Sequence, residues 1–183
     1  MWPSDASSIL TGLARAAIAR RLRLAEPTVN TPDWLSQPGA SFVTLTIDQD
    51  LRGCIGSLAA WRPLGQDVPA NALAAAFDDP RFPPLSRSEY PQVVIEVSVL
   101  SATEPIEFAP RADLLAQLRP GVDGLVLTAP GHRGTFLPQV WVELPEPADF
   151  LDHLLRKAGL PVSYWGSDVT IERYNVTAFH EMA

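Results

Sequence analysis

Hydrophobic and polar positions alternate along this chain with two periods, one typical of helices and one typical of strands. Apolar residues at helical spacing predict helices over residues 7–24, 67–77, 111–118 and 150–158. Asp67 is suited to the start of the second of these helices, and Gly159 to a left-handed end of the last one. Four helices are therefore expected, separated by strands.

Runs of β-branched residues, several of them alternating between apolar and polar, predict the strands. They cover residues 41–47, 51–58, 92–101, 124–129, 135–142 and 169–179, with hairpin turns at 48–50 and 130–134. Helices and strands follow one another irregularly rather than as βαβ units. This order favours an α+β fold with a mostly antiparallel sheet flanked by helices. We expect a single domain over residues 1–183, with a helix and loop in 1–39 and the main body in 40–183; the length also fits one compact body with two lobes.

Composition and charge narrow the class of partner. The chain has 183 residues, a formal net charge of −7, and 18 prolines spread along it as loop formers. An acidic protein gains no counterion-release energy on a phosphate backbone, so neither nucleic acid nor an anionic membrane surface is an expected partner. No signal-peptide pattern is visible and no apolar run approaches the ~20 residues that span a bilayer, so we expect a cytoplasmic protein. The sequence makes no prediction of oligomeric state.

One basic cluster departs from this acidic balance. It lies near the end of the first predicted helix and consists of Arg15, Arg20, Arg21 and Arg23. The favoured interpretation is a solvated helix face whose cations suit the negative end of the helix dipole. A contact with a partner or with a phosphate is the alternative.

The segment 51–56, with the sequence LRGCIG, is the predicted functional centre. Side chains on a strand alternate between its two faces, so the core face holds Leu51, Gly53 and Ile55 and the opposite face Arg52, Cys54 and Gly56. Arg52 and Cys54 would then lie about 6.6–6.8 Å apart along the strand. A fixed positive charge at that range lowers the pKa of a thiol and favours the reactive thiolate. Gly56 would leave room for a ligand.

Cys54 and Arg52 also have plainer interpretations. A single cysteine excludes an internal disulfide and every multi-cysteine metal site, and a lone cysteine is commonly a small core residue. Arg52 would then form a surface ion pair, for example with Asp48 or Asp50, which contributes about 0–1 kcal/mol.

A second strand supplies predicted neighbours for Arg52. In residues 93–100 the alternate apolar residues form a core face, which places Glu96 and Ser98 on the opposite face. A carboxylate in so apolar a strand needs a partner, and Arg52 is the predicted one unless this face is simply solvated. The proline-rich turn at 78–84 holds Asp79 and Arg81 in fixed directions, as the wall of a cleft or as an ordinary helix exit.

Metal and histidine chemistry have little support in the sequence. The carboxylates lack a second cluster at metal-ligand spacing, so no metal is predicted, and no cofactor motif is present. None of the three histidines lies near Cys54 along the chain. His132 is preferred to His153 and His180 as a partner for the thiol, although an exposed turn histidine is the favoured interpretation.

These segments resemble the AMMECR-type domain family, whose prokaryotic members are called AmmeMemoRadiSam system protein A. The resemblance runs from about residue 40 to 165 in the order of the family, and LRGCIG is its most specific motif. The matching stretches are 42–45, 51–56, 71–77, 79–85, 95–101, 121–125, 136–140, 150–151 and 157–161.

The resemblance implies an α+β fold with a larger and a smaller lobe, and a cleft between them lined by Arg52 and Cys54. It adds the cleft neighbours Asp79, Arg81, Glu96, Ser98 and Gln139. It also implies genetic association with a Memo-like protein, which is similar to extradiol dioxygenases, and with a radical S-adenosylmethionine protein. The resemblance implies a site and not a reaction.

Two functions follow as hypotheses. In the first, the protein is an enzyme or enzyme component that acts on a small anionic ligand: Arg52 binds the anion, Cys54 is a nucleophile or ligand contact, and Glu96 orients Arg52 or moves a proton. The remaining ligand contacts would be Gly53, Gly56, Asp79, Arg81, Ser98 and Gln139. In the second, it is a non-catalytic binding or scaffold module that recruits partner proteins, and Cys54 is inert packing. Nucleic-acid binding through the basic cluster ranks third.

Overall fold

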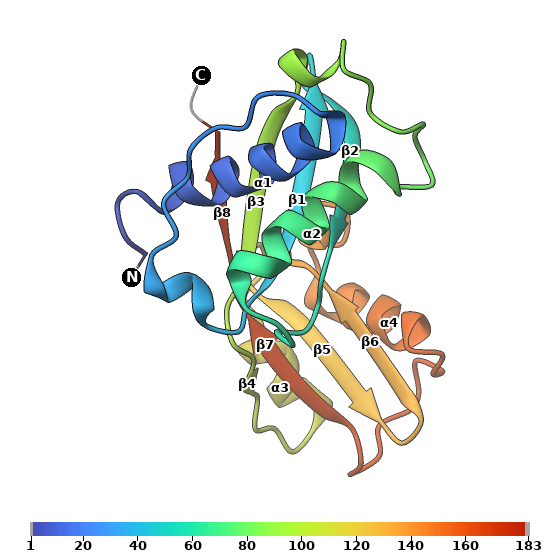
Figure 1. The fold of residues 1–183 in the computed structure, drawn as a ribbon. Helices are drawn as coiled ribbons and strands as arrows, with labels where there is room; N and C mark the ends of the chain where they lie inside the picture. Colours follow the sequence, from blue (N-terminus) through green and yellow to red (C-terminus); the bar gives the residue numbers. More distant parts are fainter. Residues whose placement is uncertain (1, 182–183) are drawn as a thin grey trace. The chain divides into compact units, whose positions relative to one another are not determined.

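The strands pair into two four-stranded sheets, and the chain divides into two compact units. The computed structural model describes residues 2–181 (Figure 1). The first unit consists of the chain up to Leu100 together with the segment from Thr177 onward, and the second unit is Ser101–Val176. The predicted α+β class with antiparallel strands is confirmed, with two sheets in place of one.

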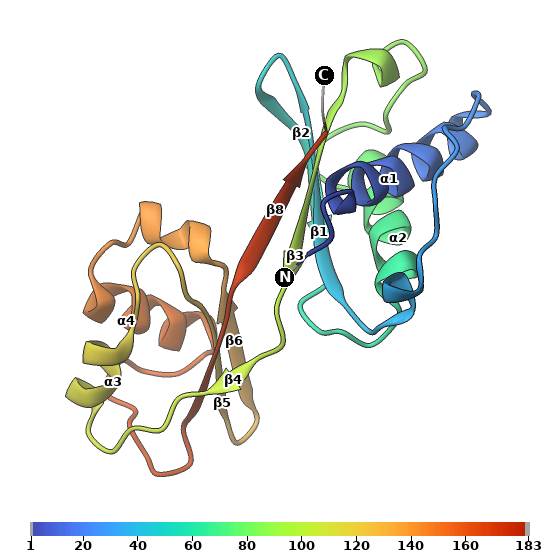
Figure 2. The same ribbon diagram turned by 90° about the vertical axis from the view of Figure 1, so that its left-hand side faces the viewer.

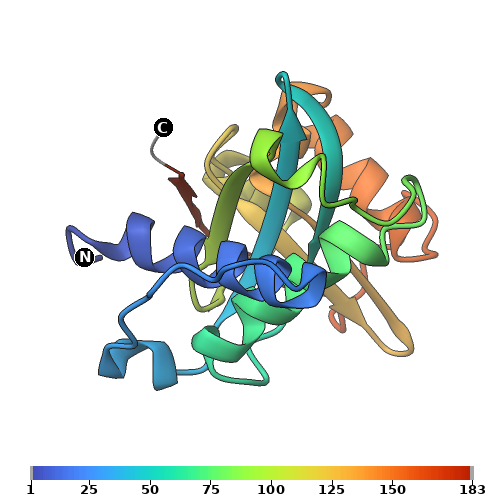
Figure 3. The same cartoon turned by 45° about the horizontal axis from the view of Figure 1, so that its top comes forward.

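The first sheet has the strand order β2-β1-β3-β8. Its strands are β1 (Ala40–Ile47), β2 (Asp50–Gly56), β3 (Val94–Leu100) and β8 (Val176–His180). Helices α1 (Ala6–Leu22) and α2 (Leu64–Phe77) lie on the same face of this sheet (Figures 2 and 3). The short 3-10 helices η1 (Asp33–Ser36) and η2 (Tyr90–Gln92) complete this unit.

The core of the first unit lies between the two helices and the sheet. Alternate residues of the central strands point into it, so Val43 and Leu45 of β1 and Ile95 of β3 are fully buried against Leu10 and Ile18 of α1. The residues between them, such as Thr44, therefore belong to the other face of the sheet. That other face carries four of the predicted site residues, Cys54, Gly56, Glu96 and Ser98.

The second sheet has the order β4-β7-β5-β6. Its strands are β4 (Glu104–Pro105), β5 (Gly124–Ala129), β6 (His132–Phe136) and β7 (Thr170–Tyr174), accompanied by α3 (Arg111–Gln117), η3 (Pro138–Val142) and α4 (Pro147–Lys157). Its core is centred on Phe150, whose ring stacks on Trp141 at a centroid distance of 3.7 Å. Gly159 follows α4 with a φ of 80°, the left-handed helix end that the sequence predicts.

The predicted strand 169–179 is two strands in two different sheets. Asn175 separates β7 from β8, and its backbone pairs with Ser101 instead of with a neighbouring strand. The Ser101 N–H donates to the Asn175 carbonyl oxygen at 2.8 Å, and the Asn175 N–H donates to Ser101 Oγ at 2.9 Å. Alternation cannot reveal such a change of sheet, because the chain stays extended on both sides of it.

Several other predicted boundaries also differ: the strand predicted from residue 135 begins at His132, inside the predicted turn, and the helix predicted from residue 150 begins at Pro147. The strand predicted over 135–142 ends at Phe136, because Pro138 has no N–H for a ladder and begins η3 instead. The helix predicted from Asp67 begins three residues earlier, at Leu64, and the Asp67 side chain makes no capping hydrogen bond. Asp67 lies inside the first turn and bonds elsewhere.

Candidate functional site

The side of the first sheet away from α1 and α2 is called here the Cys54 face. It brings four predicted site residues, Cys54, Gly56, Glu96 and Ser98, into two rows. In strand register, Thr44 of β1 lies opposite both Cys54 of β2 and Glu96 of β3. Residues directly opposite each other point to the same face, so the three form one row across three strands. Cys54 and Glu96 are two strand spacings apart, roughly 10 Å.

One hydrogen bond lies within this row, and another joins it to the neighbouring row. The Thr44 hydroxyl donates to Cys54 Sγ at 3.4 Å, a normal length for a bond to sulfur. In the next row Phe42 lies opposite both Gly56 and Ser98. Ser98 Oγ donates to Glu96 Oε1 at 3.2 Å, so the two residues predicted to share a face also share a bond.

Glu96 has a histidine partner that sequence reasoning missed. His180 Nδ1 on β8 lies 3.2 Å from Glu96 Oε2. The His180 side chain is 71% exposed, so a protonated imidazole would be paired in a well-hydrated setting. The preferred candidate, His132, lies in the second unit with its Nδ1 2.9 Å from the Ala158 carbonyl oxygen. The sequence held one indication of this partner. Phe179 and His180 are consecutive on the predicted terminal strand, so an apolar Phe179 on the core face places His180 on the opposite face.

The predicted alternation of the LRGCIG segment fails at Arg52, because β2 has a bulge there. Gly53 pairs with Leu45 and Leu51 pairs with Thr46, which leaves Arg52 as an extra residue without a partner in β1. Thr44 and Thr46 point to the same face, so Leu51 shares the Cys54 face instead of the core face. The bulge thus reverses the expected direction of Leu51, the one motif residue that precedes it.

Arg52 is paired with Glu89 instead of the predicted Glu96. Arg52 Nε donates to Glu89 Oε1 at 2.8 Å, and Nη2 donates to the Pro83 carbonyl oxygen at 2.9 Å. The Arg52 side chain is only 10% exposed. The guanidinium bond is the main cause that lowers the pKa of Glu89 to about 2. The alternative ion pair with Asp48 or Asp50 is not formed either.

The cation beside Cys54 is Arg81. Arg81 Nη2 donates to the Cys54 carbonyl oxygen at 3.2 Å and to Asp79 Oδ2 at 2.6 Å. Asp79 Oδ2 in turn accepts the backbone N–H of Cys54 at 2.9 Å. Asp79 is buried, whereas the Arg81 side chain is 53% exposed. The Arg81 bond holds the pKa of Asp79 well below its usual range and raises the pKa of Arg81.

Both glycines of the motif are required by protein contacts. A Cβ at Gly53 would lie 2.1 Å from the backbone oxygen of Ala75, so Gly53 allows α2 to pack on β2. A Cβ at Gly56 would lie 2.2 Å from the Phe42 ring. The room that the sequence predicted for a ligand at Gly56 is therefore filled by Phe42.

Gln139 stands apart from this group. It is an exposed residue of η3 in the second unit. Its role as a ligand contact stays a prediction.

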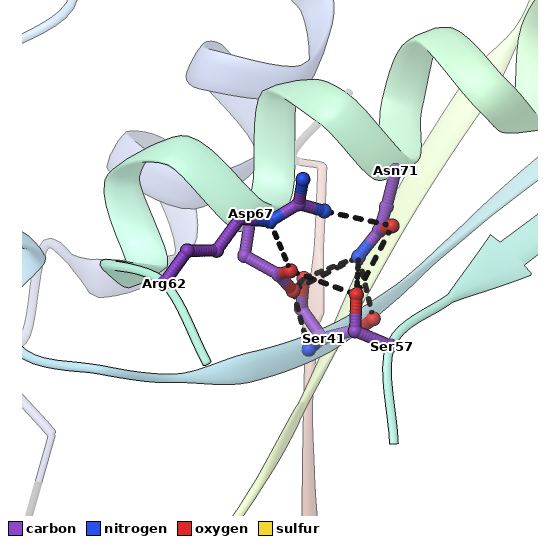
Figure 4. Close-up of polar contacts among 5 residues, drawn as sticks. All are labelled: Ser41, Ser57, Arg62, Asp67 and Asn71. Carbon is purple, nitrogen blue, oxygen red and sulfur yellow. Dashed lines mark hydrogen bonds and ion pairs between the residues drawn. The ribbon is translucent and has the colours of Figure 1, made fainter. Parts of the chain in front are cut away.

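A buried polar network is the main feature of the first unit that the sequence did not reveal (Figure 4). The Asp67 carboxylate is fully buried and accepts five hydrogen bonds. Oδ2 accepts from Ser41 N, Ser41 Oγ and Asn71 Nδ2, and Oδ1 accepts from Ser57 Oγ and Arg62 Nε, all between 2.7 and 2.9 Å. Asp67 and Asn71 are one helical turn apart, which the sequence does show, but their partners come from β1 and from the loop that precedes α2.

This network fixes the loop between β2 and α2. Ser57 and Arg62 stand at the two ends of the loop and donate to the same oxygen, Oδ1 of Asp67. The four residues between them, 58–61, are apolar and exposed, and the Trp61 side chain is stacked under the Arg62 guanidinium at 4.5 Å. Consecutive exposed apolar residues are unusual unless they bind something.

The described part of the chain offers no metal centre and no membrane span. Residues 2–181 contain no group of three His, Cys, Asp or Glu side chains placed to hold a metal ion. No helix within the same range combines the length and apolarity needed to cross a bilayer.

Known proteins resemble this chain over nearly its whole length. The AMMECR1 family model matches residues 11–179. A protein of Methanothermobacter thermautotrophicus is 38% identical over 183 residues, covering 97% of this chain and 95% of its own length. A protein of Thermococcus onnurineus is 39% identical, covering 94% and 88%. The crystal structure of an uncharacterized protein from Pyrococcus horikoshii has a TM-score of 0.77 and 36% identity, covering 94% of this chain and 89% of that one.

Proposed function

The chain belongs to the AMMECR1 family, and we propose that it is an enzyme or enzyme component that binds a small anionic ligand on the Cys54 face. The observation that carries the proposal is the row formed by Cys54, Thr44 and Glu96 across three strands. It places a thiol and a carboxylate on one surface, with a hydroxyl between them. A ligand of a few non-hydrogen atoms in length would reach from one to the other.

The structure changes which residue would bind the anion. Arg52 is buried and its charge is balanced by Glu89, so it is a poor receptor for a second anion. Arg81 keeps half of its side chain exposed beside Cys54, while its partner Asp79 is buried. We assign the anion contact to Arg81, and to Arg52 the role of holding the segment 83–89 against β2.

Cys54 and Glu96 keep the roles of thiol contact and proton carrier. The Thr44 hydroxyl donates to Cys54 Sγ and would stabilise a thiolate there. Glu96 has His180 as a second titratable group within 3.2 Å, so the pair can accept or release a proton at the other end of the row.

Alkylation of Cys54 by a charged and a neutral reagent tests the proposal. Cys54 is the single cysteine, so all modification reports on this site. The rate ratio of iodoacetate to iodoacetamide should exceed that of N-acetylcysteine at low salt, by about threefold, because Arg81 attracts the anion. Arg81→Gln should abolish the excess and Arg81→Lys should keep it, while the second-unit control Arg133→Gln leaves it unchanged. A ratio equal to that of N-acetylcysteine in the unmodified protein would overturn the assignment.

The exposed loop 58–61 favours a second candidate function, a non-catalytic module that recruits partner proteins. Trp61 is 70% exposed and its loop is anchored by the Asp67 network, a combination typical of a preorganised interface anchor. The partners implied by the family resemblance are a Memo-like protein and a radical S-adenosylmethionine protein. With the purified Memo-like protein as probe, loss of co-elution for Trp61→Ala together with retention for Cys54→Ala would favour recruitment over catalysis.

A further inference from the structure

The basic cluster at the end of α1 divides into one partly buried arginine and three exposed ones. Arg15 turns inward, where its Nη2 donates to Glu181 Oε2 at 2.6 Å and its guanidinium stacks on the Tyr90 ring. The other three arginines rim a groove of about 410 Å³ between α1 and α2. Its lining consists of Ala17, Arg20, Arg21, Arg23, Pro69 and Leu73.

Two of the three cations at this groove have no carboxylate partner in the described part of the chain. Arg20 is held by Glu26, with Nη2 2.7 Å from Oε2. Within residues 2–181, no ion pair reaches Arg21 or Arg23, and Arg21 lies over the Phe77 ring with its charged carbon 5.6 Å from the centroid. The protein has a net charge of −7, so this groove is a local region of positive charge on an acidic protein.

The helix dipole favours Arg20 and Arg21 in the last turn of α1, but the carbonyl groups at this end are bonded by another residue. Arg87 donates to the carbonyl groups at this end of α1. Its Nε donates to the Leu22 oxygen at 2.8 Å, and its Nη2 lies 3.5 Å from the oxygen of Arg23, the residue after the helix. Arg23 itself occupies the left-handed position after the helix, with φ 57° and ψ 46°. Glycine is the usual residue there, and strained backbone of this kind is concentrated at functional sites.

We propose that this groove is a binding site for a small organic anion, a carboxylate or phosphate attached to an apolar body. Its volume lies in the range of about 300–1,000 Å³ that small-molecule sites occupy. Arg21 and Arg23 would bind the anionic group, and Ala17, Pro69 and Leu73 would contact the apolar body. The site is separate from the Cys54 face, because it lies on the helices and not on the exposed side of the sheet.

Nitrogen-15 chemical shifts of the full-length protein locate binding directly. Hexyl phosphate and hexanoate supply the two possible headgroups, and hexylammonium has the same body with the opposite charge. We expect saturable shifts at the amides of Ala17, Arg21 and Leu73, with half-saturation near or below about 1 mM for at least one of the anions. Sodium chloride should weaken the binding, and hexylammonium should not shift these amides.

Two variants connect the binding to the arginines. Arg23→Gly removes a cation and relieves the left-handed backbone, so it should fold at least as well as the parent chain. Arg21→Gln removes the second cation. Each should weaken anion binding at least fivefold, whereas Arg133→Gln should have no effect. Unchanged binding by Arg23→Gly, equal shifts with hexylammonium, no saturable shift with either anion, or shifts confined to the Cys54 face would each overturn the proposal.

Discussion

Thr44 and Cys54 lie directly opposite each other on β1 and β2, and the Thr44 hydroxyl donates to the cysteine sulfur at 3.4 Å. This hydrogen bond joins the first two residues of the row that ends at Glu96 and His180. It gives Cys54 a donor supplied by the rigid centre of the sheet, so the thiol is held in one direction.

Replacing Thr44 by valine should slow the alkylation of Cys54. The substitution keeps the shape and removes the donor that stabilises a thiolate. We expect a twofold to fivefold lower iodoacetamide rate at pH 8, with a change of about 1 kcal/mol or less in the free energy of unfolding. Thr46→Val, on the same strand and face, is the matched control. Equal rates for the two variants would show that the hydroxyl has no influence on the thiol.

Removing the Arg52 guanidinium should destabilise the fold. Arg52→Met leaves the Glu89 carboxylate half-buried and the Pro83 carbonyl without its donor. We expect a loss of about 2–4 kcal/mol in the free energy of unfolding, measured by urea denaturation. The double variant Arg52→Met with Glu89→Gln should recover part of that loss, because the unpaired charge is gone. No recovery would mean that the packing of Arg52 matters more than its charge.

The same pair predicts how stability depends on pH. The pKa of Glu89 is about 2 in the folded protein and near 4.5 when the pairing is absent. A carboxyl group with a lowered folded-state pKa stabilises the fold above its unfolded pKa, and this contribution is lost as the pH falls from about 5 toward 2. Glu89→Gln should therefore flatten the fall in unfolding free energy between pH 5 and pH 3, by about 1–2 kcal/mol. An unaltered slope would contradict the assigned partner.

The two glycines of the motif should differ in their tolerance of alanine. At Gly53 the added methyl group would meet the backbone oxygen of Ala75 at 2.1 Å, which only a shift of α2 can relieve. At Gly56 it would meet the Phe42 ring, which can rotate away. We expect Gly53→Ala to lose about 3 kcal/mol or more and Gly56→Ala about 1–2 kcal/mol in thermal or urea unfolding. The reverse order would indicate that the Phe42 ring is the more rigid neighbour.

Asp67→Asn tests whether the exposed loop depends on the buried network. An amide in place of the carboxylate turns one acceptor into a donor that faces other donors. We expect a loss of about 2–4 kcal/mol in stability and faster backbone amide hydrogen exchange in residues 57–62. Asp48→Asn, in the exposed turn between β1 and β2, is the control. Unchanged exchange in the loop would show that Asp67 stabilises the core alone.

The sequence predicted the elements better than their contacts. Strict alternation in 93–100 correctly placed Glu96 and Ser98 on one face, because β3 is regular throughout. The same reasoning failed in the LRGCIG segment, where one bulge makes Arg52 an extra residue. Glu89 could not be recognised as the partner of Arg52, since its position depends on how the segment 78–93 folds back. The Asp67 network was invisible for a similar reason: a helix-start aspartate looks the same whether it caps its own helix or binds serines far along the chain.

The two hydrogen bonds between Ser101 and Asn175 have a consequence for how the protein is assembled. The second unit begins and ends at this pair, so it is inserted into the first unit as a loop whose two ends meet. The first unit, by contrast, gains its edge strand β8 only after the helices and strands of the second unit have been synthesised. We therefore expect an amino-terminal fragment ending at residue 100, which lacks β8, to stay incompletely folded.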